Sequence, residues 1–173
     1  MLLYLIRHAH AVKEEEDPLR PLSARGRDDV RRLAVFLQAN HALAAAQLWH
    51  SPLLRARETA ELLATALGME GTLVETGDLL PEDEPETVAR RIHAFPQGRS
   101  LALVGHEPHL SRLATLLLRG KTQPAAVDFR KGAVLALGPT GDHHRRTGEP
   151  RWDVKWLLTP SLLPTQASLP QPL

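Results

Sequence analysis

Two short apolar runs in this sequence each end abruptly next to a histidine. The first, Leu2 to Ile6, is followed directly by Arg7-His8, and the second, Leu101 to Val104, stops one residue before His106. Short runs without polar alternation are typical of strands that are buried on both faces of a sheet. In folds built on such strands, ligands bind beyond the carboxyl ends of the strands. We therefore expect both histidines at one end of a common sheet.

Helical periodicity fills the intervals between the apolar runs. Val30, Leu33 and Leu37 recur at helical spacing behind Ser23, which suits the N-cap of a helix reaching about Gln38. The other expected elements are strands over 48–50, 73–75, 133–137 and 154–158, and helices over 51–67, 86–95 and 110–118, the first of these helices capped by the hydroxyl of Ser51. Strands that alternate with helices predict an α/β fold of three layers, with a mainly parallel central sheet and helices on both faces.

The last two strands are expected to pair as a hairpin across the turn-rich segment 138–150. Trp152 and Trp156 are four residues apart in this region. Because side chains alternate between faces along a strand, both indoles are expected to pack on the same face.

The length of the chain favours one domain. With 173 residues it can bury a substantial core, and we expect that domain over residues 1–159. The segment 160–173, in which Pro, Ser and Gln recur, is expected to be a poorly ordered tail. The N-terminal apolar run is too short for a signal peptide, and no stretch is long enough to cross a bilayer. A soluble, cytoplasmic protein is therefore expected.

Charge and cysteine content exclude several classes of function. The formal net charge is +1, which gives no global reason to expect attraction to nucleic acid or to a membrane. The chain contains no cysteine, so disulfides, thiolate catalysis and Cys-ligated zinc are excluded. The sequence leaves the oligomeric state open.

Four side chains at the predicted strand and helix ends suit the transfer of a phosphoryl group. Transfer without a metal needs a nucleophile and positive charge around the equatorial oxygens. The neutral imidazole of His8 can attack phosphorus, while the planar forks of Arg7 and Arg55 can clamp the oxygens. His106 can hydrogen-bond these oxygens or stabilise developing charge. The predicted site needs neither a metal nor another cofactor.

The same residues carry a family resemblance. Leu-Ile-Arg7-His8-Ala-His-Ala, Ser51-Pro-Leu-Leu-Arg55-Ala-Arg-Glu-Thr and Val-Gly-His106 resemble the motifs of the histidine phosphatase superfamily, also called phosphoglycerate mutase-like. Within it, the Arg-Pro-Leu-Ser stretch at 20–23 and Lys-Gly-Ala at 131–133 look most like the SixA-type phosphohistidine phosphatases. The resemblance implies a phosphoglycerate mutase-like fold, a phosphorylated nucleophile at His8 and a phosphate pocket of Arg7, Arg55 and His106. It also implies a metal-free phosphatase that acts on phosphate monoesters or on phosphohistidine of signalling proteins.

Two positions depart from the family pattern. Ala9 stands where the family usually has glycine, which restricts the backbone beside the nucleophile. Pro81 stands where many members carry a glutamate general acid, and Asp78, Glu82 and Asp83 remain alternatives for that role. Since the imidazole of phosphohistidine leaves more easily than an alkoxide, the absence of this acid favours phosphohistidine as substrate.

Three other readings stay open. The protein can instead be a phosphatase for a small sugar or nucleotide phosphate, or a catalytically silent module that binds phosphorylated partners. A metal site of His8, His10, His106 and His109 is disfavoured, because no carboxylate completes a recognisable ligand pattern.

Overall fold

The computed structural model describes residues 1–164, which form one mixed sheet between two pairs of helices. The strands are β1 (Leu3–Arg7), β2 (Gln47–His50), β3 (Leu73–Glu75), β4 (Leu101–Gly105), β5 (Val134–His143) and β6 (Pro150–Leu158). The helices are α1 (Ala24–Ala39), α2 (Leu54–Leu67), α3 (Pro85–His93) and α4 (His109–Arg119). The strand order is β3-β2-β4-β1-β5-β6, in which β3, β2, β4 and β1 are parallel and β5 runs antiparallel to both neighbours.

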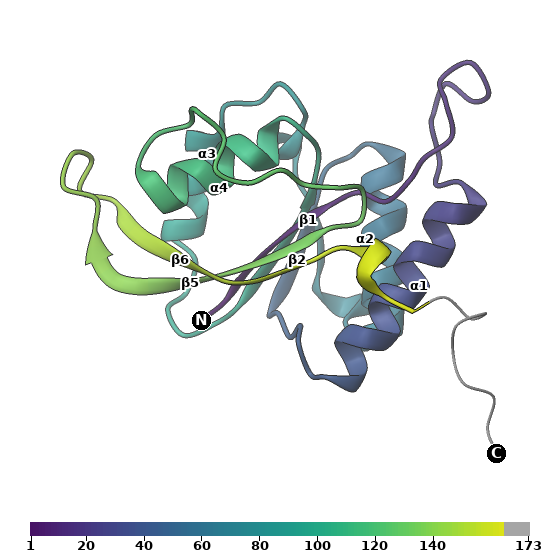
Figure 1. Cartoon of the computed structure of the whole chain (residues 1–173), viewed down its shortest axis with the longest axis horizontal. Helices are drawn as coiled ribbons and strands as arrows, with labels where there is room; N and C mark the ends of the chain where they lie inside the picture. Colours follow the sequence, from purple (N-terminus) through teal and green to yellow (C-terminus); the bar gives the residue numbers. More distant parts are fainter. Residues whose placement is uncertain (165–173) are drawn as a thin grey trace.

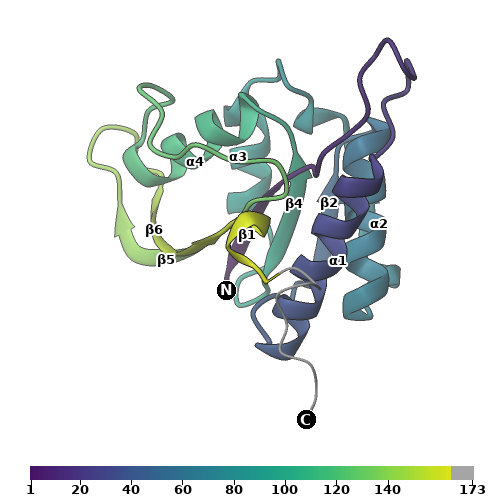
Figure 2. The same cartoon turned by 45° about the vertical axis from the view of Figure 1, so that its right-hand side comes forward.

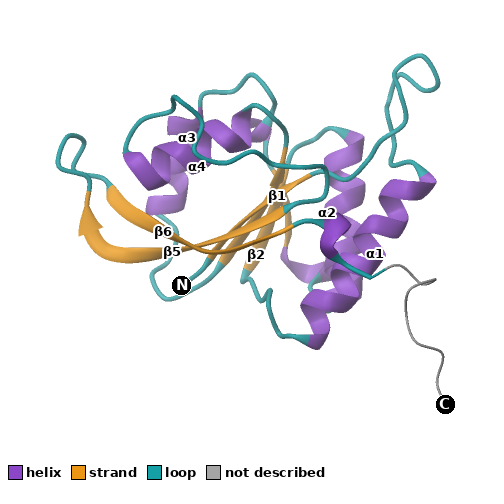
Figure 3. Cartoon of the chain, viewed as in Figure 1, coloured by secondary structure: helices purple, strands orange, loops and turns teal. Residues whose placement is uncertain are grey.

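The helices cover both faces of the sheet, so the predicted three-layer α/β fold is confirmed. Helices α1 and α2 lie on one side and α3 and α4 on the other (Figures 1 and 2). Colouring by secondary structure shows the sheet as the middle layer (Figure 3). No helix in the described part of the chain is long and apolar enough to span a membrane.

Each face of the sheet has its own apolar core. Strands β1 and β4 are almost completely buried, and alternate side chains along them enter opposite cores. Tyr4 and Ile6 pack with α1 and α2, whereas Leu3 and Leu5 pack with α3 and α4. Burial on both faces explains why these strands read as continuous apolar runs in the sequence.

The chain changes faces between β1 and β4. The helices that follow β1 and β2 cover one face, and those that follow β3 and β4 cover the other. Strands β1 and β4 are nevertheless direct neighbours, so the connections leaving their carboxyl ends diverge to opposite faces. In open α/β sheets this divergence leaves a crevice in which ligands bind.

Two element boundaries differ from the sequence prediction. Helix α2 begins at Leu54 with Leu53 as its N-cap and no side-chain cap, so the predicted start at 51–52 and the capping role of Ser51 are wrong. The hairpin strands are longer than predicted, because β5 and β6 continue pairing to His143 and Pro150.

The two tryptophans of β6 lie on opposite faces, contrary to the prediction. Ala136 pairs with Trp156 and the next residue, Leu137, pairs with Val154, so one residue of β6 is bulged out. A one-residue bulge reverses the alternation of side chains beyond it. Trp156 therefore contacts Tyr4, with 6.0 Å between ring centroids, while Trp152 is buried in the core on the other face.

The described chain forms regular structure beyond residue 159, the predicted end of the domain. Pro160–Leu162 forms a short 3-10 helix, and Leu163 is buried against the core beneath α1 and α2. Arg32 donates hydrogen bonds to the carbonyls of Pro160 at 3.1 Å and Leu163 at 3.2 Å. The prediction of a poorly ordered tail is thus wrong for residues 160–163, and residues 165–173 lie outside the described part.

The N-terminus of α1 packs directly on the segment that follows β1. A Cβ atom on Gly26 would lie 2.0 Å from the carbonyl oxygen of His10, far inside van der Waals contact. We expect Gly26→Ala to lower the free energy of unfolding by about 2–3 kcal/mol, because backbone must shift to admit the methyl group.

Urea denaturation measures this loss. Gly71→Ala is the matched control, because no atom lies within 4 Å of the added Cβ at that position. Equal unfolding free energies for the two variants would contradict the close packing at Gly26.

Candidate active site

The pairing of β1 with β4 brings the two predicted histidines together. Arg7 is paired with Gly105 in parallel register, so His8 and His106 are the next residues of adjacent strands. The backbone N–H of His8 donates to the carbonyl of Gly105 at 3.0 Å. The two imidazole rings have centroids 5.0 Å apart and planes inclined at 50°.

His8 is held as a neutral imidazole of one tautomer. Its Nδ1 lies 2.7 Å from the carbonyl oxygen of Ala9, which can only accept, so Nδ1 carries the proton and Nε2 keeps a lone pair. Burial and, secondarily, repulsion that a protonated His8 would feel from a protonated His106 and from Arg55 and Arg7 lower the pKa of His8 to about 3, against the opposing hydrogen bond to Ala9. At neutral pH the ring is therefore uncharged and nucleophilic at Nε2.

His106 contacts Ser51, a partner that the sequence did not indicate. Nε2 of His106 lies 2.8 Å from Oγ of Ser51, which is completely buried. Pairing of β2 with β4 places Ser51 here, because its N–H donates to Val104 at 3.1 Å. Burial, followed by the charge of Arg55, lowers the pKa of His106 to about 3, so this ring is also neutral.

Arg7 and Arg55 add two positive charges beside these rings. Nη1 of Arg7 donates to the carbonyl of Phe129 at 2.5 Å, and Arg55 lies in the first turn of α2. Burial and the neighbouring Arg20 lower the pKa of Arg55, although it stays charged at neutral pH. Neither guanidinium forms an ion pair with a carboxylate of residues 1–164. The charges are thus available to an anion.

Two residues of α2 that follow Arg55 fix the loops of the site. The hydroxyl of Thr59 accepts the N–H of Ala9 at 3.1 Å and donates to the carbonyl of Arg55 at 2.7 Å. The carboxylate of Glu58 accepts the N–H of Leu22 at 2.6 Å and also pairs with an arginine of α1 at 2.7 Å. The Glu-Thr pair was visible in the sequence motif, but its positioning role depends on contacts between elements.

The segment before β5 is also hydrogen-bonded to the backbone of His8. The N–H of Gly132 lies 3.2 Å from the carbonyl oxygens of both Arg7 and His8. Gly132 has φ +75°, in the left-handed region that favours glycine. Ala9, by contrast, is outside that region, since only Arg20 and His41 among the described non-glycine residues have positive φ. Alanine at position 9 therefore causes no backbone strain.

The three candidate acids lie in different environments. Burial would raise the pKa of Asp78, but hydrogen bonds from Thr76 and Arg91 hold it below its ordinary value. The carboxylate of Asp83 accepts the N–H of Leu80 at 2.6 Å, and Glu82 is exposed. Asp78 is therefore ionised and engaged, which makes it a poor proton donor.

The other two histidines of the disfavoured metal site lie in separate environments. Nδ1 of His10 lies 2.8 Å from Oγ of Ser23 at the start of α1, and His109 is buried in the first turn of α4. Among residues 1–164 there is no group of three or more His, Asp or Glu side chains arranged to hold a metal ion.

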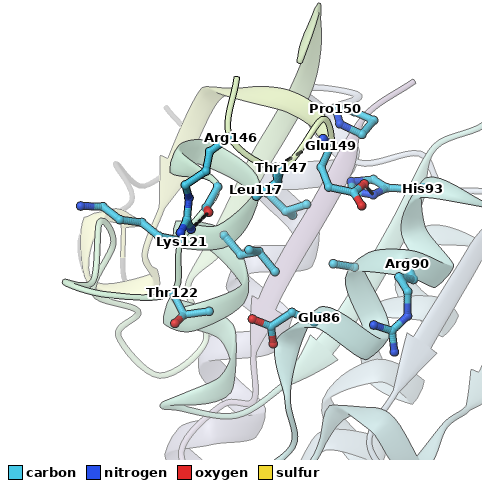
Figure 4. A pocket seen from close by; sticks show the side chains of 13 residues that line it. Glu86, Arg90, His93, Leu117, Lys121, Thr122, Arg146, Thr147, Glu149 and Pro150 are labelled. Atoms are coloured by element: carbon cyan, nitrogen blue, oxygen red, sulfur yellow. Dashed lines mark hydrogen bonds and ion pairs between the residues drawn. The ribbon is translucent and has the colours of Figure 1, made fainter. Parts of the chain in front are cut away.

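A separate cavity of about 370 Å³ lies between α3, α4 and the β5–β6 turn (Figure 4). At its wall His93 pairs with Glu149 at 2.7 Å, and Arg146 donates to the carbonyl of Gly120 at 2.9 Å. Helices α3 and α4 run back from the carboxyl ends of β3 and β4. This cavity therefore lies toward the amino ends of the parallel strands, away from the paired histidines at the carboxyl ends. It is not part of the candidate site.

Comparison with known proteins identifies relatives of this chain. Residues 3–82 match the sequence profile of the histidine phosphatase superfamily, branch 1. An uncharacterized protein from Picosynechococcus sp. is 31% identical over 166 residues, which cover 88% of this chain and 98% of the relative.

Solved structures share the fold over almost the whole chain. The protein histidine phosphatase SixA, solved with tungstate, has a TM-score of 0.77 at 24% identity, covering 94% of this chain and 99% of that one. A mycobacterial glucosyl-3-phosphoglycerate phosphatase has a TM-score of 0.63 at 16% identity, covering 89% and 96%. At these identities the structural likeness shows the fold, and both protein and small-molecule phosphatases are among the proteins that share it.

The buried neutral histidines make stability depend on pH. In the unfolded chain a histidine titrates near 6.5, whereas His8 and His106 titrate near 3 in the fold, so between these values the unfolded chain binds more protons. Stability is therefore complete above about pH 6.5 and falls as the pH decreases, by about 1.4 kcal/mol per pH unit for each histidine.

We expect His8→Asn to remove about one histidine's share of this slope between about pH 4 and 6. Urea denaturation at several pH values measures the slope for both proteins. The control is His143→Asn at an exposed position, a variant that keeps both buried histidines and therefore the slope that they cause. A slope that His8→Asn leaves intact would show that His8 is protonated in the fold.

Proposed function

Because the chain belongs to the histidine phosphatase superfamily and is SixA-like, we propose that it hydrolyses phosphohistidine on a protein substrate, without a metal, by way of a phosphoryl group carried on His8. The observation that carries this proposal is the state of His8. Its Nδ1–H donates a hydrogen bond to the Ala9 carbonyl, and Nε2 of the neutral ring keeps its lone pair beside Arg7 and Arg55.

The first step transfers the phosphoryl group to His8. The lone pair of Nε2 forms a bond to phosphorus as the bond from phosphorus to the substrate nitrogen breaks and its electron pair stays on that nitrogen. The Nδ1–H of His8 keeps its bond to Ala9, which stabilises the positive charge that the ring gains.

The arginines and His106 stabilise the charge of the transferred group. Arg7 and Arg55 present guanidinium donors without carboxylate partners, and such donors match phosphoryl oxygens in geometry and charge. Neutral His106 can donate one hydrogen bond to these oxygens, and Ser51 holds its ring in place. Since all four groups sit on strand and helix ends, little reorganisation accompanies the transfer.

The second step releases phosphate. Water attacks phosphorus, the bond between phosphorus and Nε2 breaks, and its electron pair returns to the neutral ring. The protons of the water remain on the phosphate, so this step requires no further acid. His8 is then ready for another cycle with its Nδ1 proton unchanged.

The environment of the acidic loop supports phosphohistidine over an alkyl ester as substrate. An alkoxide needs a proton as it leaves, whereas a phosphohistidine ring that is protonated on its other nitrogen leaves as neutral imidazole. Asp78 is engaged by Arg91, and Asp83 by the backbone of Leu80. These contacts disfavour Asp78 and Asp83 as proton donors for a monoester, and the exposed Glu82 is the candidate acid that remains.

The test of the mechanism is acid-labile phosphorylation of the purified protein during turnover of phosphoramidate in the presence of a chelator. We expect label on the parent protein and none on His8→Ala, whose turnover should fall by about a thousandfold or more because the nucleophile is lost. His143→Ala is the matched control and should be labelled normally. Undiminished turnover by His8→Ala would overturn the mechanism, and loss of turnover in chelator would overturn metal independence.

The leaving-group argument gives a second expectation. Turnover of a phosphohistidine protein should exceed that of an alkyl phosphate monoester by about a hundredfold or more, because general acid catalysis normally contributes that much to the ester reaction. Phosphate release from both substrates, measured at equal concentration, checks this ratio. A ratio near one would favour the small-molecule phosphatase, and phosphate binding without any turnover would favour the non-catalytic module.

A further inference from the structure

The cavity between α3, α4 and the β5–β6 turn (residues 144–149) has the size of a small-molecule site. Its volume of about 370 Å³ lies in the range of about 300–1,000 Å³ that is typical of ligand pockets. Side chains from both helices and from the turn surround it (Figure 4). None of the residues that line it belongs to the candidate active site, so a ligand bound there occupies a second site.

The β5–β6 turn covers this cavity and is fixed in place. Nε2 of His144 donates to the carbonyl of Leu117 at 2.9 Å, and Arg146 donates to the carbonyl of Gly120 at 2.9 Å. Both carbonyls belong to the C-terminal end of α4, where the helix leaves acceptors free. The ion pair of Glu149 with the histidine of α3 joins the turn to the other helix. Because the turn is held from both sides, the cavity is formed before a ligand binds.

The inner wall of the cavity is aliphatic. Ala89 of α3 and Leu117 of α4 are buried there, and Leu116 and Pro150 extend the apolar surface. Water in contact with such a wall finds few hydrogen-bond partners, whereas a hydrocarbon chain gains free energy by leaving water. The wall therefore favours a ligand with an apolar part.

The exposed rim of the cavity is positively charged. Three cationic side chains of the lining have no carboxylate of residues 1–164 within 4.0 Å, namely Arg90, Lys121 and Arg146. Of the two acids in the lining, Glu149 is paired with a histidine at 2.7 Å, and Glu86 forms no ion pair within the described chain. The unpaired cations thus outnumber the unpaired carboxylate, which favours an anionic group on the ligand.

We propose that this cavity binds a small amphipathic anion, a carboxylate on a short aliphatic chain. The chain lies against the aliphatic wall, and the carboxylate accepts hydrogen bonds from Arg90 and Arg146 at the rim, whose guanidinium groups suit a carboxylate in geometry and charge. A cavity of this size, enclosed by two helices and a turn, suits a small molecule better than a protein segment. The site goes beyond the proposed function and requires neither phosphoryl transfer nor His8.

The test is calorimetric titration with three inert probes. Hexanoate is compared with butanoate, which is two methylene groups shorter, and with 1-hexanol, which lacks the charge. We expect hexanoate to bind the parent protein about tenfold more tightly than either. Each buried methylene group contributes about fourfold in affinity, and one charge-assisted hydrogen bond contributes about tenfold.

Two variants test the charged rim. Arg90→Gln/Arg146→Gln should lower the affinity for hexanoate by about tenfold, to that for 1-hexanol, because the carboxylate loses its donors. Arg99→Gln/Arg145→Gln is the matched control, since it changes the net charge equally at two exposed arginines outside the lining. It should bind hexanoate like the parent protein.

Two further variants test the aliphatic wall. Ala89→Leu extends a larger side chain into the cavity and should abolish the binding of both hexanoate and 1-hexanol. Thr87→Leu, at an exposed position of α3 outside the lining, is the control and should leave both affinities unchanged. Circular dichroism of each variant shows that its fold is intact.

Arg55→Gln distinguishes this cavity from the candidate active site. The variant removes a charge from the phosphate pocket and should leave the affinity for hexanoate unchanged. Loss of hexanoate binding in Arg55→Gln would assign the carboxylate to the phosphate pocket and overturn the second site.

Other results also overturn the site. Equal affinities for hexanoate and butanoate exclude contact of the chain with the aliphatic wall, and equal affinities for hexanoate and 1-hexanol exclude the charged rim. Absence of hexanoate binding overturns the proposal outright. If the parent protein is then dimeric by sedimentation, the cavity is assigned to a second copy of the chain. None of these results depends on phosphorylation of His8, so the phosphatase mechanism is tested separately.

Discussion

The parallel pairing of β1 with β4 is the interaction on which the rest of the structure depends. It sets Arg7 opposite Gly105, so the following residues, His8 and His106, face one another at the carboxyl edge of the sheet. Because the helices after these strands cover opposite faces, the connections separate here and leave the crevice open. Without this neighbour relation, two residues 98 positions apart in sequence would have no reason to meet.

The electrostatic character of the site follows from burial. Both imidazoles are enclosed beside guanidinium groups, and burial and positive neighbours favour the uncharged ring. The same enclosure strengthens attraction between the arginines and an anion, because little water screens the charges. A neutral nucleophile amid fixed positive charge is what attack on a phosphoryl dianion requires.

Much of the fold was predictable because each strand and helix has a local pattern. The structure confirms the buried strands β1 and β4, the Ser23 cap of α1 and the alternation of strands with helices. The failures have one kind of cause. The bulge in β6 places Trp152 on the opposite face of the sheet from Trp156. Ser51 hydrogen-bonds His106 because β2 pairs with β4. Neither the bulge nor this hydrogen bond can be predicted from the local sequence.

By itself, the sequence determined which residue types stand at the ends of the strands, because apolar periodicity and its interruptions are local properties of the chain. It thereby indicated His8, Arg55 and His106 as one group. Only the tertiary structure decided the protonation of His8, the partner of each polar group and the exclusion of Asp78 from proton donation. These depend on burial and on contacts between distant segments, which arise only when the sheet and both helical layers pack together.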